Sequence, residues 1–268
     1  MKLFVQTIQE PVRNSYWPDQ TSYRWMSTLP HLAWAWEFLR RNAGYRTAYK
    51  SAVADTPIGT VPENSTALRF GLLRFEDPDR DALAANVFWR ITDCHEVLPL
   101  AASAMGEGTA SSTLNLESLQ CRTTVCPRDA EARQDVLLTQ DGRTLQLAVF
   151  GETPLAEALL LTPALPSPAL ADRRLRAVRR LTDLVKHGWM RPFLYPRERR
   201  AERLVHVVQA LDGWKAEASH RDIGIALYGE ARIARDWTDP RDHLRDQVRR
   251  AIRHGRDLMA DGYRRFLR

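Results

Sequence analysis

Residues 219–259 have the sequence SHRDIGIALYGEARIARDWTDPRDHLRDQVRRAIRHGRDLM, whose pattern predicts two helices joined by a link. Ser219 and Asp222 have the S-x-x-D spacing of a capping box, which satisfies free backbone N–H groups where a helix begins. Gly229 suits the end of that helix, because glycine readily adopts the backbone conformations of a helix terminus. We therefore expect a short helix over 219–229, followed by a connection of about ten residues.

The second expected helix, over 240–258, is long and amphipathic. Thr238 or Asp239 can cap it, and Pro240 suits the first helical position. At about 100° per residue, its apolar side chains share one arc: Leu244, Val248, Ala251, Ile252, Gly255, Leu258 and Met259. Four basic side chains share an adjoining arc of about 80°: Arg245, Arg249, Arg253 and Arg256. Asp246 and Asp257 lie away from the centre of this basic arc.

A helix face of one sign points to a polyanion. Like charges at i and i+4 repel by a few tenths of a kcal/mol, and bound phosphates would relieve that repulsion. Arginine also donates two parallel hydrogen bonds to phosphate or guanine. We predict contact with double-stranded DNA, and the candidate DNA-binding residues are Arg221, Arg241, Arg245, Arg249, Arg250, Arg253 and Arg256. The alternative is an ordinary solvated face, because scarce lysine indicates a GC-rich coding bias that favours arginine everywhere.

The distribution of charge agrees with a basic C-terminal module. The 268 residues carry a net charge of +6. From Ser167 onward there are 24 Lys and Arg against 14 Asp and Glu, a net of +10, which leaves −4 for residues 1–166. Such asymmetry favours a nucleic-acid-binding segment attached to a nearly neutral remainder.

A short helix followed by a longer basic helix is the order of a helix-turn-helix, whose second helix enters the major groove. The expected link is longer than the usual three or four residues. Either a winged or loop-extended variant or no helix-turn-helix at all remains open. We expect Trp237, in this link, to pack against the core.

The N-terminal segment is rich in aromatic residues, and half of the eight tryptophans lie before residue 37. Residues 30–49, PHLAWAWEFLRRNAGYRTAY, predict a helix that begins at Pro30 and carries Glu37 four residues before Arg41, and a second short helix is expected to follow. So short a segment cannot bury its rings alone. Either it docks on the rest of the chain, or it offers an aromatic surface to RNA polymerase, an antiactivator protein or a second copy of the chain. The candidate protein-interaction residues are Trp17, Trp25, Trp34 and Trp36.

The centre of the chain changes to strand-like patterns. Strands are expected within 66–75, 86–91, 113–119 and 121–125 and on both sides of Asp141-Gly142, a dipeptide that favours a hairpin. The predicted fold class is α+β, with a helical N-terminal segment, a central antiparallel β region and an all-α C-terminal domain. We expect three domains. They are a helical N-terminal domain over 1–60, a β-rich central region over 66–165 and a helical DNA-binding domain over 167–268.

Two further helices are expected at the start of the C-terminal domain. Residues 169–188 place five apolar side chains near one face: Leu170, Leu175, Val178, Leu181 and Val185. Residues 197–213 repeat Leu204, Val207, Val208 and Leu211 at helical spacing, and Gly213 is expected to end that helix.

Several function classes lack support in the sequence. No glycine-rich phosphate loop, HExxH motif or nucleophile elbow is present, so we expect no enzyme, no catalytic residue and no cofactor. Cys94-His95 and Cys121-x4-Cys126 have poor zinc-site spacing, so we expect buried free thiols rather than a metal. Neither an apolar run of about 20 residues nor a secretory signal is visible, which predicts a cytoplasmic protein without a membrane partner.

Two long segments resemble a known family. Residues 31–49 (HLAWAWEFLRRNAGYRTAY) look like the transcriptional-regulator-like domain at the N-terminus of FseA-like transcriptional activators of proteobacterial integrative and conjugative elements. Residues 187–267, from HGWMRPFLYP to ADGYRRFL, are similar to the C-terminal domain of the same activators, formerly of unknown function. The resemblance implies a sequence-specific activator of excision and conjugative-transfer genes, with a helix-turn-helix whose support helix matches 219–229 and whose recognition helix matches 240–258.

The same resemblance leaves a rival function open. Related proteins that have only the C-terminal domain can act as antiactivators without binding DNA. The alternative is therefore a protein-binding regulator, an antiactivator or polymerase-interacting module, for which sorted arginines would be unnecessary. A homodimer is plausible because one short helix reads few base pairs, although no dimer interface is visible in the sequence.

Overall fold

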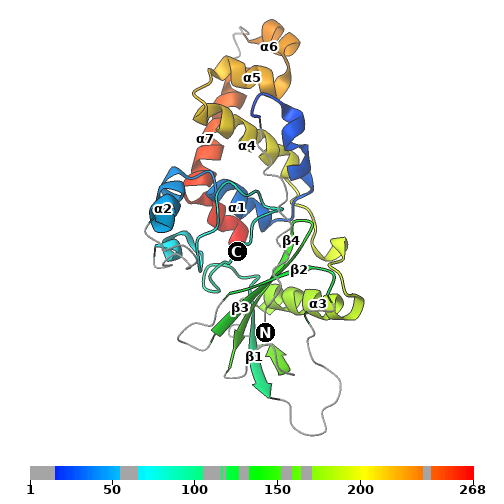
Figure 1. The fold of residues 1–268 in the computed structure, drawn as a ribbon. Helices are drawn as coiled ribbons and strands as arrows, with labels where there is room; N and C mark the ends of the chain where they lie inside the picture. Colours follow the sequence, from blue (N-terminus) through cyan, green and yellow to red (C-terminus); the bar gives the residue numbers. More distant parts are fainter. Residues whose placement is uncertain are drawn as a thin grey trace. The chain divides into compact units, whose positions relative to one another are not determined.

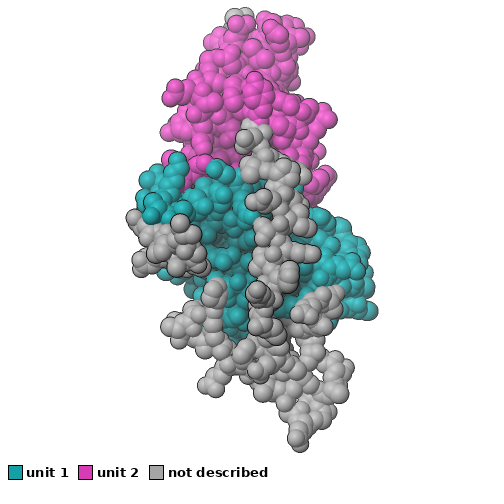
Figure 2. Space-filling view, viewed as in Figure 1, with its two compact units in different colours: residues 1–11, 47–195, 267–268 teal, residues 12–46, 196–266 magenta. Residues whose placement is uncertain are grey.

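The computed structural model describes residues 16–54, 66–104, 116, 119–126, 133–151, 159–163, 171–237 and 243–268. The chain divides into two compact units (Figure 2). Unit 1 contains residues 1–11, 47–195 and 267–268, and unit 2 contains residues 12–46 and 196–266. One sheet together with separate helices confirms the predicted α+β class.

Unit 1 is built on a five-stranded sheet with the strand order β2-β3-β4-β1-β5 (Figure 1). The strands are β1 (Leu98–Ala104), β2 (Arg122–Val125), β3 (Arg133–Gln140), β4 (Arg143–Phe150) and β5 (Leu159–Pro163). The β1–β4 pair is parallel, and the other neighbouring pairs are antiparallel. The strand expected over 113–119 lies outside the described residues except for Leu116 and Leu119.

The hairpin between β3 and β4 is confirmed. Gln140 pairs with Arg143, which leaves Asp141 and Gly142 as a two-residue loop. Their φ angles are 50° and 74°, and positive φ at both central positions is what a tight hairpin turn matched to the strand twist requires. The Asp-Gly dipeptide therefore sets the register of the two central strands.

Helix α3 (Ala171–His187) packs on one face of this sheet. It buries Ala177 and Leu184, whereas Leu175 and Val185 of the expected apolar face are 52% and 51% exposed. Val178 and Leu181 of the expected face do pack against the core. Arginine stems take part in the packing in place of Leu175 and Val185: Arg180 is 9% exposed and its guanidinium lies 4.6 Å from the Tyr195 ring. This helix belongs to unit 1, whereas the sequence suggested a C-terminal helical domain that starts before it.

Irregular chain meets the other face of the sheet. Side chains alternate along a strand, so Gln146 points away from Leu145 and Leu147, which pack with α3. The Gln146 side-chain amide donates to the Trp89 carbonyl at 2.9 Å, and its oxygen accepts from the Trp89 N–H at 2.9 Å. The strands expected within 66–75 and 86–91 do not form: η2 (Ala67–Phe70) and a single Leu72–Trp89 bridge replace them. Another short 3-10 helix, η5 (Pro192–Leu194), follows α3.

Unit 2 is helical and brings together two segments that are far apart in the sequence, residues 12–46 and 196–266. Its elements are η1 (Gln20–Thr28), α1 (Ala33–Leu39), the start of α2 (Ala43–Ala54), α4 (Ala201–Lys215), α5 (His220–Tyr228), α6 (Glu230–Asp236), α7 (His243–Ala260) and most of η6 (Gly262–Leu267). Helices α4 and α7 approach closely at Gly255, where a Cβ atom would stand 2.9 Å from Leu211 Cβ and 3.1 Å from the Val207 carbonyl oxygen. The expected short helix after residue 44 is present as α2.

A buried ion-pair network fastens the N-terminal segment to α4. Arg41 Nη1 lies 2.7 Å from Glu37 Oε2, the pair expected from their spacing. The same guanidinium donates to both carboxylate oxygens of Asp212, at 2.8 and 3.0 Å, and the Tyr23 hydroxyl donates to Asp212 at 2.9 Å. Burial raises the pKa of Glu37, but Arg40 and Arg41 outweigh it and hold that pKa below its ordinary value.

Two expectations about the C-terminal helices were wrong. The connection expected after Gly229 contains a helix of its own, α6, separated from α5 by that single glycine. Gly213 does not end α4, which continues to Lys215. At Gly213 a Cβ atom would stand 2.9 Å from atoms of Ile223 and Trp17, so this glycine permits close packing instead.

Candidate nucleic-acid interface

Helix α7 has the predicted apolar face. Leu244, Val248, Ile252 and Leu258 are each at most 5% exposed, and Gly255 is buried with them. They pack against α4 and α5, with Val248 and Ile252 in one cluster with Ala210, Ile223 and Leu227. The sequence order of apolar and basic residues therefore fixes which side of α7 is turned to solvent.

The arginines occupy that solvent side. Arg249, Arg250, Arg253 and Arg256 are exposed, and Arg245 is partly buried. Arg249 Nη1 lies 3.4 Å from Asp246 Oδ1, with both side chains 47% exposed, so the pair is too solvated to hold the guanidinium firmly. Within the described residues, Arg250, Arg253 and Arg256 form no ion pair. The charges of Arg250, Arg253 and Arg256 are thus available to a ligand.

Two tryptophans from other elements support the ends of the arginine row. The Arg256 guanidinium lies 4.7 Å from the Trp214 ring of α4, and the Arg245 guanidinium lies 5.7 Å from the Trp237 ring after α6. A guanidinium stacked on a ring keeps its edge N–H groups free for phosphate or base oxygens. Sequence reasoning missed this role of Trp214, because no local spacing links it to Arg256.

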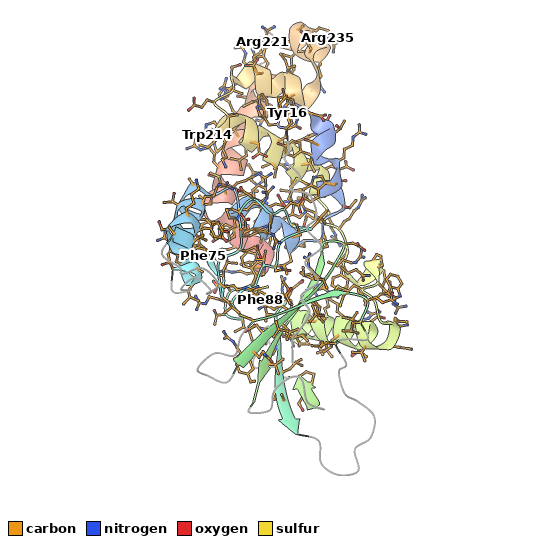
Figure 3. The ribbon with its side chains drawn as sticks, in the orientation of Figure 1. Tyr16, Phe75, Phe88, Trp214, Arg221 and Arg235 are labelled. Atoms are coloured by element: carbon orange, nitrogen blue, oxygen red, sulfur yellow. The ribbon has the colours of Figure 1, made fainter. Side chains whose placement is uncertain are left out.

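Helix α5, the short helix expected over 219–229, is capped as predicted. Ser219 Oγ accepts from the Asp222 N–H at 3.1 Å, and Gly229 closes α5 with its N–H on the Ile225 carbonyl at 2.8 Å. Arg221 is exposed on α5, and Figure 3 shows it at the same end of unit 2 as Arg235 of α6. Trp237 packs against the core cluster, as expected. Arg241 and the expected cap of α7 lie outside the described residues.

The four candidate interaction tryptophans do not form one surface patch. Trp34 is fully buried and Trp36 is 2% exposed, so these two belong to the core of unit 2. Trp36 packs edge-on against Tyr45 with ring centroids 5.6 Å apart. Trp17 is partly buried against the helical core, and Trp25 is partly buried on η1. For Trp34 and Trp36 the structure therefore favours docking on the rest of the chain over exposure to a partner.

Two histidines of unit 2 have lowered pKa values. Burial lowers the pKa of His206, which contacts Gln20 and the Tyr228 ring as a packed side chain. Burial also lowers the pKa of His254 on α7, and Arg265, Arg203 and Arg200 lower it further against the opposing charge of Asp257. The cations around His254 therefore disfavour its protonated form in the free protein.

Two family models match the chain. Residues 156–268 match the RovC-type model described as "T6SS, Transcription factor, DNA binding domain", and residues 16–85 match "Proteobacterial transcriptional regulator-like domain". Both matches fit a two-domain transcription regulator. All the arginines of α7 fall inside the DNA-binding match, and each match includes residues of both compact units. No curated protein matched the chain in a sequence search.

Other site types find no geometry in the part of the chain that the structure describes. There, no three His, Cys, Asp or Glu side chains are grouped to hold a metal ion, and Cys94, Cys121 and Cys126 are free thiols. Burial raises the pKa of Cys94 to about 12 and that of Cys121 to about 11, which makes both thiols poor nucleophiles. Among the helices that are described, none combines the length and apolar character needed to cross a bilayer.

Proposed function

We propose that this regulator is a sequence-specific DNA-binding activator that inserts α7 into the major groove, with α5 as the support helix before it. The observation that carries the proposal is the row of exposed arginines on α7, of which Arg250, Arg253 and Arg256 form no ion pair within the described residues. An α-helix about 10–12 Å wide fits a major groove about 12 Å wide. The DNA-binding family match supports the same ligand.

The arginines divide into two roles by position. Arg249 and Arg253 are exposed near the middle of α7, where they suit base edges. Arg245 is expected to join them from the beginning of the helix, where Trp237 orients its guanidinium. Arg221, Arg241 and residues near the helix ends are expected to contact phosphates. These contacts would fix the register of the protein on the duplex.

The resemblance in sequence suggests excision and conjugative-transfer genes of a mobile element as the targets, whereas the matched DNA-binding family carries T6SS in its description. We favour the mobile-element targets because both ends of the chain resemble those activators. Chromatin immunoprecipitation with sequencing distinguishes the two sets of promoters. RNA polymerase, an antiactivator and a second copy of the chain are the protein partners expected of an activator of this kind.

Fluorescence anisotropy with the promoters beside the gene tests DNA binding directly. Specific binding should survive competition by bulk DNA and should weaken steeply as salt rises, because phosphate contacts release counterions. Arg249→Ala should cost about 1–3 kcal/mol on specific DNA if Arg249 contacts a guanine. Arg176→Ala is the matched control, because Arg176 is an exposed helical arginine of α3 in the other unit.

Three outcomes would contradict the proposal. They are binding that ignores salt, the absence of any sequence preference, and equal losses for Arg249→Ala and the control. Binding that ignores salt would favour the protein-binding regulator instead.

A further inference from the structure

A second group of cations lies in unit 2, outside the row on α7. It contains Arg200 at the start of α4, Arg203 in the first turn of α4, His254 of α7 and Arg265 of η6. The three arginines are exposed, and within the described residues none of them forms an ion pair. Three separate elements thus bring four basic side chains to one place.

Contacts in unit 2 bring these groups together. The Arg265 guanidinium lies 4.8 Å from the Phe266 ring, which packs on His31, and His31 contacts Glu198 beside the start of α4. His254 precedes Gly255, which packs against Val207, one turn after Arg203 on α4. Burial lowers the pKa of Arg265, and Arg200 and Arg203 lower it further against the opposing charge of Glu198. The pKa of His254 falls through burial and then through the same three arginines, as described above. Like charges held together disfavour the free protein and favour an anionic ligand.

The nearby acids do not neutralise the group. Glu198 contacts His31 Nδ1 through one carboxylate oxygen and accepts the Arg200 N–H at 3.1 Å through the other. An open hollow of about 470 Å³ lies beside these groups. Residues 197–203 line it, and four of these seven are arginines, Arg197, Arg199, Arg200 and Arg203. The same seven residues include Glu198 and Glu202, so the lining has four cations against two anions and remains basic and accessible.

The position on α7 indicates what the group can bind. At about 100° per residue, Arg245 and Arg256 lie on one flank of the solvent side, and Arg250 and His254 lie on the other. A helix in the major groove has one sugar–phosphate backbone on each side, because the groove is about as wide as the helix. The flank with His254 continues onto α4 and η6 through Arg203 and Arg265.

We propose that Arg200, Arg203, His254 and Arg265 form a phosphate clamp that binds the backbone of one DNA strand, while Arg256 on the opposite flank contacts the backbone of the other. This inference rests on the proposed insertion of α7 into the major groove. The clamp positions the helix and adds affinity without reading sequence, because phosphates are the same at every base pair. A bound phosphate also favours the imidazolium form of His254, so binding takes up a proton.

The test uses the full chain with the double variant Arg200→Gln/Arg203→Gln and the single variant Arg265→Gln. Specific and unrelated duplexes are titrated at several salt concentrations by anisotropy. Each lost contact should weaken both duplexes by a similar factor, about 3–10-fold, and should reduce the magnitude of the salt slope by about 0.9. Arg176→Ala is again the control, and the melting temperature of each variant checks that unit 2 is folded.

His254→Gln gives a second measurement that does not depend on removing an arginine. The charged groups around His254 are Arg200 and Arg203 from α4, Arg265 from η6 and Asp257 on α7 itself. In the wild-type chain, affinity for DNA should rise as pH falls from 8 to 6, because protonated His254 is stabilised by the bound phosphate. His254→Gln should flatten this pH dependence.

The outcomes separate the two proposals. Salt-dependent binding by the wild type, with unchanged salt slopes in the arginine variants, overturns the clamp alone. A loss confined to the specific duplex also overturns it, since that loss would indicate base readout. A wild-type chain without salt-dependent DNA binding overturns both the clamp and the proposed function.

Discussion

Removal of the Asp212 carboxylate should strongly destabilise unit 2. This carboxylate accepts two hydrogen bonds from the buried guanidinium of Arg41, which belongs to the N-terminal segment of the unit. The Arg41 side chain is 6% exposed and the Asp212 side chain 18%, with the two N···O distances at 2.8 and 3.0 Å. In Asp212→Ala, Arg41 keeps only Glu37 as a carboxylate partner among the described residues, and the Tyr23 hydroxyl loses its acceptor. Breaking a buried pair in this way costs about 3–5 kcal/mol. The partial exposure of Asp212 places the expected loss at the low end, about 3 kcal/mol.

Urea unfolding followed by tryptophan fluorescence is a suitable assay, since six of the eight tryptophans belong to unit 2. The matched control is Asp236→Ala, which removes a carboxylate that pairs with Arg235 at 2.8 Å on the surface of α6. This control should leave the free energy of unfolding nearly unchanged, because an exposed pair is already well solvated. A loss for Asp212→Ala no larger than that of the control would refute the role assigned to the network.

A double variant sharpens the test. Arg41→Met with Asp212→Leu removes both charges and fills their space with apolar atoms, while Glu37 keeps its ion pair with Arg40. Replacement of a whole buried pair is often close to neutral, whereas each single change leaves one charge without its partner. The double variant should therefore lose less stability than Asp212→Ala. Additive losses would show that the two side chains act independently.

Three further changes test single contacts. Trp214→Ala should weaken DNA binding about two- to fivefold, because a cation–π contact with Arg256 at 4.7 Å is worth about 0.5–1 kcal/mol, and anisotropy at fixed salt measures the loss. The lowered pKa of Glu37 means that its pairing stabilises unit 2 above the unfolded-state pKa of about 4.3 and is lost as pH falls through the folded pKa. Unfolding between pH 3 and 6 should show this loss in the wild type, and Glu37→Gln should have a flatter profile. Gly255→Val should lower the melting temperature, with a cost of about 1–3 kcal/mol, because its Cβ would meet Leu211 Cβ at 2.9 Å.

Local chemistry predicted the features that depend on neighbours in sequence. The Ser219 cap and the Gly229 terminus of α5 were predicted in this way, as was the Asp-Gly turn between β3 and β4. The apolar side of α7 followed from helical period alone. Each of these rests on a backbone preference or a periodicity that operates within a few residues.

Features decided by distant contacts could not be predicted in the same way. The aromatic composition of residues 86–91 favoured a strand. In the structure, however, the Trp89 N–H donates to the side chain of Gln146, 57 residues away, and the Trp89 carbonyl accepts from the same side chain. Helix α3 was expected to join the helices after it, but its buried side packs on the sheet of unit 1. In both cases contacts with residues far away in the sequence, rather than local preference, decide the outcome, since burial of apolar area outweighs local preference.

The arginines of α7 show where local reasoning ends within the candidate interface itself. Periodicity placed four of them on one arc, but the side chains that orient and extend this row come from elsewhere in unit 2: Trp214 from α4, Trp237 from the end of α6, and Arg265 from η6. A count of cations on α7 alone therefore underestimates the charge that a duplex would meet. If DNA contacts both flanks of the helix, the salt slope of the wild-type chain must exceed the value that the α7 arginines can supply, since each phosphate contact adds about 0.9 to its magnitude. A slope that the α7 arginines account for by themselves would mean that the duplex does not contact Arg200, Arg203 or Arg265.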